Sequence, residues 1–134
     1  MRFFLTIEYD GTDFIGWQKQ NSGPSIQEKI EECIYKITQV KCSIYGSGRT
    51  DAGVHSKGQV AHVDILKKFS SKRLMDAINA YLLDYKIKIT EVKPTIPDAH
   101  ARFSAISREY EYVILNRYAP PALDDGRVWH QRID

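Results

Sequence analysis

Two amphipathic segments, each flanked by stretches of alternating apolar and polar residues, constrain the fold of this chain most strongly. Residues 25–38 and 70–82 carry apolar side chains at helical spacing, and Ser25 and Glu28 have the spacing of a capping box at a helix start. The alternating stretches, which we expect to form strands, are 3–10, 40–45, 58–65, 85–92 and 108–116. This order of strands and helices predicts an α+β fold, a ferredoxin-like two-layer sandwich whose mostly antiparallel sheet carries two helices on one face.

Length and composition suit one soluble domain covering residues 1–134. The net charge of +2 is only weak evidence for a nucleic-acid partner. No apolar run is long enough to cross a membrane, and the amino terminus lacks the pattern of a signal peptide, so we expect a cytoplasmic protein. Two cysteines, Cys33 and Cys42, lie in apolar-patterned segments and are expected to be reduced core thiols.

The stretch from Gly46 to His55 holds three glycines within eight residues, which indicates a sharp turn or a close approach to a ligand. It also holds Arg49 and Asp51, which are close enough in sequence to face one cleft. A carboxylate there is a candidate nucleophile or base, and the guanidinium suits a phosphate group. The alternative is a tight surface turn with an ion pair and no function.

Several ordered motifs around this stretch resemble the tRNA pseudouridine synthase A family. The segment from Gly48 to His55 is similar to the family's active-site signature. The other matching segments are Glu8–Thr12, Gly16–Gln18, Ser25–Glu28, Gly58–Val60 with His62, His100–Ala105 and Arg108–Tyr112. The resemblance covers nearly the whole chain, and it implies an RRM-like form of the same sandwich, the amino-terminal half of the pseudouridine synthase fold.

The resemblance implies an isomerase that converts uridine to pseudouridine in the anticodon stem-loop of tRNA, at positions 38, 39 and 40, without a metal or other cofactor. Asp51 matches the catalytic aspartate, and it would act as the nucleophile. Arg49 matches the arginine that pairs with that aspartate and fills the space left by the flipped nucleotide. Tyr110 matches the tyrosine that stacks on the target base. The sequence leaves open whether Asp51 attacks uracil C6 or ribose C1′, or whether a glycal forms.

Four further residues are candidates for substrate binding beside Tyr110. Arg102 would contact phosphate or a loop, although a structural ion pair is an equal alternative. Trp17 and Gln18 lie in the first loop, where Trp17 would stack on a base or, as we prefer, pack under the loop. His55 is expected to orient the signature loop, and His62 is expected to be structural.

Members of this family usually have a second, similar half, so we expect this chain to be a piece whose full-length form is a homodimer that wraps tRNA. A different class of function is a non-catalytic RNA-binding or dimerisation half of the same fold. Asp51 argues against that alternative, because a neutral or basic residue would serve RNA affinity better. A third hypothesis is a carboxylate-dependent nucleosidase, which would release free uracil.

Overall fold

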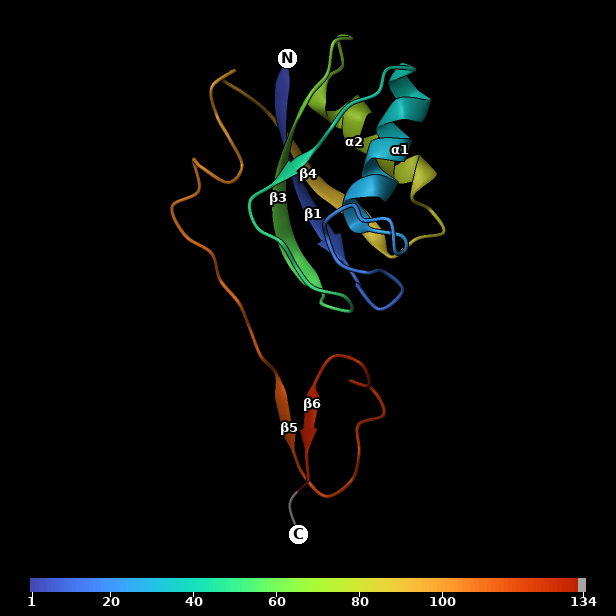
Figure 1. The fold of residues 1–134 in the computed structure, drawn as a ribbon, viewed down its shortest axis with the longest axis vertical. Helices are drawn as coiled ribbons and strands as arrows, with labels where there is room; N and C mark the ends of the chain where they lie inside the picture. The colour runs from blue at the N-terminus through green and yellow to red at the C-terminus, as the bar shows by residue number, and fades with distance from the viewer. Residues whose placement is uncertain (133–134) are drawn as a thin grey trace.

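The computed structural model describes residues 1–132. Its main sheet has four antiparallel strands in the order β2-β3-β1-β4, and two helices lie against one side of it (Figure 1). The elements are β1 (Arg2–Tyr9), α1 (Ile26–Thr38), β2 (Tyr45–Gly46), β3 (Ser56–Asp64), α2 (Ser71–Tyr81), β4 (Ile87–Thr95), β5 (Ile114–Asn116) and β6 (Trp129–Gln131). The predicted α+β sandwich with two helices on one face is confirmed.

The core forms where one face of the sheet meets the two helices. Alternate β1 residues, from Phe3 to Tyr9, are buried, as period-two patterning requires. Both helices begin as predicted, since Ser25 accepts the backbone N–H of Glu28 and Ser70 accepts that of Arg73. The helix side chains buried against the sheet are Ile26, Ile30, Cys33, Ile34, Leu74 and Ile78. Apolar burial on this face fixes the position of β1 and β3, which border the site.

The predicted strand over residues 40–45 is wrong for all but its last residue. Only β2 pairs with the sheet, with Tyr45 opposite His62 and Gly46 opposite Ala61. Continued in this register, Ser43 would already lie opposite Asp64, the last residue of β3. The residues before Ser43 therefore have no strand to pair with, despite their alternating pattern.

Two further strands differ from their predicted ranges by more than two residues at their ends. β4 continues through Pro94 to Thr95, beyond the predicted end. This is tolerated because β4 is an edge strand, where a residue without an N–H loses no ladder bond on its outer side. The predicted strand over 108–116 shrinks to β5, which pairs in parallel with β6 and not with the main sheet. In Figure 1 this carboxyl-terminal segment extends away from the sandwich.

None of the helices within residues 1–132 is long and apolar enough to cross a membrane. Cys33 is buried and Cys42 is partly buried, and both are free thiols, as predicted.

Candidate active site

The loop that carries Asp51 lies across the first loop of the chain. The backbone N–H of Trp17 donates to the carbonyl of Thr50 over 3.1 Å, and Asp51 forms an isolated antiparallel bridge with Gly16. The hydroxyls of Tyr9 and Thr50 are 2.8 Å apart and share a hydrogen bond. The position of Asp51 therefore depends on a segment more than thirty residues earlier in the sequence.

Glycines in the first loop make this crossing feasible. A Cβ atom on Gly16 would lie 2.5 Å from the Thr50 carbonyl oxygen, and Gly16 has a φ of +113°, which side chains disfavour. A Cβ atom on Gly11 would overlap the carbonyl oxygen of Val54. The close approach is between two loops of the chain, and Gly11 and Gly16, which allow it, precede the predicted glycine-rich stretch.

A buried glutamine on β3 holds the start of the signature loop. Gln59 donates to the carbonyl of Gly48 over 2.7 Å and accepts the Ser47 hydroxyl over 2.9 Å. Gln59 shares the buried face of β3 with Ala61 and Val63. Sequence reasoning missed this role, although a glutamine at a core-facing strand position is a usable signal, since buried amides need partners.

His55, at the end of the signature loop, hydrogen-bonds to two other segments of the chain. Its Nδ1 accepts the N–H of Gly11 over 3.0 Å, so Nε2 carries the hydrogen and donates to the Gly126 carbonyl over 2.8 Å. The neighbouring Asp10 accepts from the hydroxyl and N–H of Thr12, which are the main reasons its pKa is lowered to about 2. The charge of Arg127, whose guanidinium lies 2.7 Å from the Asp10 carboxylate, lowers that pKa further.

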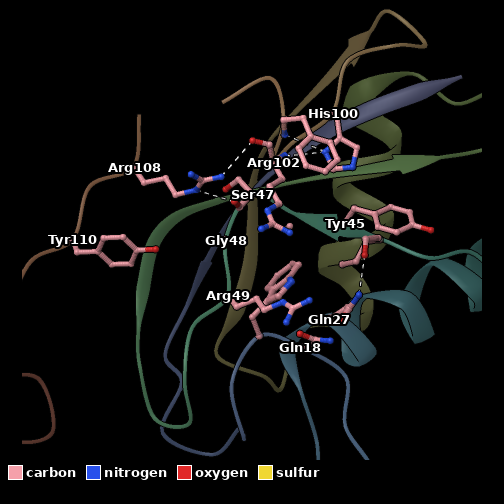
Figure 2. A pocket seen from close by; sticks show the side chains of 14 residues that line it. Gln18, Gln27, Tyr45, Ser47, Gly48, Arg49, His100, Arg102, Arg108 and Tyr110 are labelled. Carbon is pink, nitrogen blue, oxygen red and sulfur yellow. Dashed lines mark hydrogen bonds between the residues drawn. The ribbon is translucent and has the colours of Figure 1, made fainter. Parts of the chain in front are cut away.

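A pocket of about 670 Å³ opens beside this loop (Figure 2). The residues that line it are Trp17, Gln18, Gln27, Ile44, Tyr45, Gly46, Ser47, Gly48, Arg49, His100, Arg102, Phe103, Arg108 and Tyr110. Three of them are arginines, and within residues 1–132 none of the lining side chains is a carboxylate. The lining is thus suited to an anion such as a nucleic-acid phosphate.

The structure brings five predicted site residues to this pocket, but it does not place Asp51 or His55 in its lining. Arg49 and Asp51 are both exposed, and no ion pair joins them within the described part of the chain. The expected Arg49–Asp51 pair is therefore not formed in this structure. Asp51 holds a backbone bridge at Gly16, whereas the Arg49 side chain turns toward the pocket in Figure 2.

Tyr110 and Arg102 are positioned through Arg108, which sequence reasoning quoted only as part of a motif. The Arg108 guanidinium donates to the carbonyls of Ser47 (2.8 Å) and Arg102 (3.3 Å). It thereby ties the segment after β4 to the signature loop. Tyr110 is 64% exposed, and its hydroxyl lies 3.4 Å from where a Cβ atom of Gly48 would stand.

Trp17 is buried, as the preferred interpretation predicted. Its indole packs against Gly46, where a Cβ atom would lie 2.7 Å from Nε1, and its ring stacks with that of Tyr9. Stacking on a base is therefore disfavoured for Trp17, which supports the pocket floor. Gln18 is partly exposed at the rim. His62 is buried and structural, since its Nδ1 accepts the N–H of Ala101 over 3.0 Å.

The sequence of this chain matches those of known proteins. The family model described as tRNA pseudouridine synthase matches residues 5–104, which include most of β1, all of β2 to β4, both helices and the signature loop. The chain belongs to this family. The matched range ends before Arg108 and Tyr110, which line the pocket.

Relatives in this family include three proteins named tRNA pseudouridine synthase A. The chain is 48% identical over 129 residues to that of Rhodospirillum centenum, 50% over 130 residues to that of Ehrlichia ruminantium strain Welgevonden, and 51% over 130 residues to that of Wolbachia pipientis wMel. Each alignment covers 96% of this chain and 53% of the relative. The chain thus spans about half the length of these curated relatives.

Proposed function

We propose that this chain carries the catalytic aspartate of a tRNA pseudouridine synthase that isomerises uridine in the anticodon stem-loop, at positions 38, 39 and 40. The observation that carries the proposal is the arginine-lined pocket beside the Asp51 loop, in a member of this family. The pocket supplies positive charge for the RNA backbone, and the target uridine would leave the helix stack to enter it. The named relatives point to tRNA as the substrate.

The reaction breaks the bond between ribose C1′ and uracil N1, and it forms a bond between C1′ and C5. The hydrogen on C5 is lost and N1 gains one, so the product is an isomer of the substrate. We assign Asp51 as the nucleophile, at uracil C6 or ribose C1′ or by way of a glycal. None of these routes requires a metal or another cofactor.

The remaining roles follow from the side chains that line the pocket. When RNA is bound, Arg49 would fill the space that the flipped nucleotide leaves in the RNA, and it would approach Asp51. Tyr110 would stack on the target uracil, with Gln18 at the rim. For Arg102 we favour a phosphate contact over the structural ion pair, since no carboxylate partner of Arg102 occurs within residues 1–132.

A second candidate is a half that binds RNA or dimerises without catalysis. The exposure of Asp51 favours it, because electrostatic catalysis depends on excluding water from the site. Relatives about twice as long suggest a further half that would close the cleft, and we expect the full-length protein to be a cytoplasmic homodimer that wraps tRNA. In that case this chain alone would bind RNA and turn it over slowly.

Nucleoside analysis of tRNA that has been incubated with this chain distinguishes these hypotheses. The proposed function predicts pseudouridine with no free uracil, and it predicts that Asp51→Ala abolishes the product. Asp84→Ala, which removes an exposed carboxylate in the turn after α2, is the matched control and should leave the product unchanged. Free uracil would favour the nucleosidase. A folded chain that binds tRNA without any product would favour the non-catalytic half.

A further inference from the structure

A cluster of aromatic rings forms the end of the pocket that lies opposite Tyr110. Tyr45 and His62 stack with ring centroids 5.0 Å apart and an interplanar angle of 23°. His100 meets His62 edge-on at 4.4 Å, and Phe103 lies 4.3 Å from His100. Figure 2 shows Tyr45 and His100 on one side of the pocket and Tyr110 on the other, with Arg49 and Arg102 between them.

Backbone hydrogen bonds hold these rings in place. His62 is buried on β3 and pins the turn after β4 by accepting the N–H of Ala101. His100 fixes the next residues, since its Nδ1 accepts the N–H groups of Arg102 (3.1 Å) and Phe103 (3.3 Å). The two histidine rings are therefore held in position before any ligand binds, which lowers the entropic cost of binding.

The outer rings of the cluster are accessible. Phe103 is 78% exposed and Tyr45 is 52% exposed, although both are large rings that a fold normally covers. The guanidinium of Arg102 lies 5.7 Å from the Phe103 ring. Exposed aromatic faces beside arginines, in a lining without carboxylates among the described residues, match the way proteins bind single-stranded nucleic acid. A purely apolar partner would have no use for the arginines.

We propose that Tyr45, His100 and Phe103 form a second base-binding subsite, which stacks the unpaired nucleobase next to the target uridine while Arg102 contacts the phosphate between the two nucleotides. This inference rests on the proposed function, because it takes Tyr110 as the stacking partner of the target uracil. Stacking the neighbouring base would replace the stacking that the RNA loses when the uridine leaves the helix. The subsite would thereby hold the strand open at the target.

The subsite is testable with anticodon stem-loop RNAs that differ at one nucleotide. The nucleotide on the 5′ side or on the 3′ side of the target uridine is replaced by an abasic one, and dissociation constants for this chain are measured by fluorescence anisotropy at fixed salt. Phe103→Ala should weaken binding of the intact RNA roughly 5- to 100-fold. The same substitution should have no effect on one of the two abasic RNAs, because that RNA lacks the base that stacks on Phe103.

Three further variants separate stacking from other causes. Phe103→Trp should retain the affinity of the wild type, whereas Phe103→Leu should bind as weakly as Phe103→Ala, since only an aromatic face stacks. Tyr81→Ala removes an exposed tyrosine on α2, outside the pocket lining, and should leave affinity unchanged. Phe103 is largely exposed, so its replacement leaves the core intact, which circular dichroism verifies.

Equal losses on intact and both abasic RNAs, or full affinity for Phe103→Leu, would overturn the subsite. If wild-type chain and variant then still form pseudouridine, the proposed function stands without it. If the wild-type chain bound none of the RNAs and formed no pseudouridine, both inferences would fall together.

Discussion

Replacing Gly16 by alanine should displace the signature loop, although no residue of that loop is changed. Gly16 lies in the first loop, with a φ of +113°, and pairs through a backbone bridge with Asp51. An alanine Cβ atom would stand 2.5 Å from the carbonyl oxygen of Thr50, which is backbone and has no free rotation to move away. Either the first loop or the Thr50–Asp51 segment must shift.

The size of the effect follows from two terms. Holding alanine at this φ costs about 1–3 kcal/mol. Relieving the clash lengthens the hydrogen bond from Trp17 N–H to the Thr50 carbonyl, 3.1 Å in the structure, and losing such a bond costs about 0.5–1.5 kcal/mol. Together these terms lower the free energy of unfolding by about 1.5–4.5 kcal/mol, which is a fall of roughly 5–20 °C in Tm for a domain of this size.

Urea and thermal denaturation measure this loss, and a turnover assay on tRNA measures the displacement of Asp51. Gly58→Ala on β3 is the matched control, because the nearest atom to its new Cβ, Thr6 Cγ2, is 3.8 Å away. That control should be neutral or stabilising by up to about 1 kcal/mol. If Gly16→Ala were as stable and as active as Gly58→Ala, the contact of Gly16 with the Thr50–Asp51 segment would not be needed to position Asp51.

Two further predictions concern the supports of the site. Gln59→Leu leaves the carbonyl of Gly48 and the hydroxyl of Ser47 without their partner. The substitution should therefore lower the free energy of unfolding by about 1–3 kcal/mol and slow turnover more than it weakens RNA binding. Unchanged turnover would show that Gln59 does not hold the loop. Asp10 has its pKa lowered from 3.8 to about 2, so it stabilises the fold above about pH 4, and that contribution is lost as the pH falls from about 4 to about 2. Asp10→Asn should therefore be less stable than the wild type at pH 7. The difference between their urea midpoints should disappear near pH 2. A difference that stays the same at every pH would contradict this linkage.

Local patterns predicted the sandwich because its core is built from regular periodicities. The alternation in β1 and the helical stripe of α1 each point at a single buried face, and both faces are buried as expected. The alternating pattern gave a wrong prediction where strand pairing depends on a partner that is distant in the sequence. Residues 108–113 alternate like a strand, yet they lie outside the main sheet and are exposed. Whether such a segment forms a strand depends on a neighbouring edge that periodicity does not encode.

The candidate site was predictable in its residue types but not in its contacts. The signature segment pointed to Asp51 and Arg49, and the segment Arg108–Tyr112 pointed to Tyr110; the pocket contains Arg49 and Tyr110. The Arg49–Asp51 ion pair is not formed in this structure, where Asp51 takes part in a backbone bridge with Gly16 and Arg49 lines the pocket. The supporting role of Gln59 was missed, since its partners are backbone and hydroxyl groups of a loop whose course only the fold defines.

Tritium release from tRNA that carries C5-tritiated uridine tests the central claim most directly, because the label leaves only when C5 bonds to the ribose. The measurement compares the 134-residue chain with its Asp51→Ala variant, and filter binding of the same tRNA verifies that both proteins bind it within a few-fold of each other. We expect release by the wild-type chain and none by the variant. Release of equal size from the two proteins would contradict the assignment of Asp51 as the nucleophile.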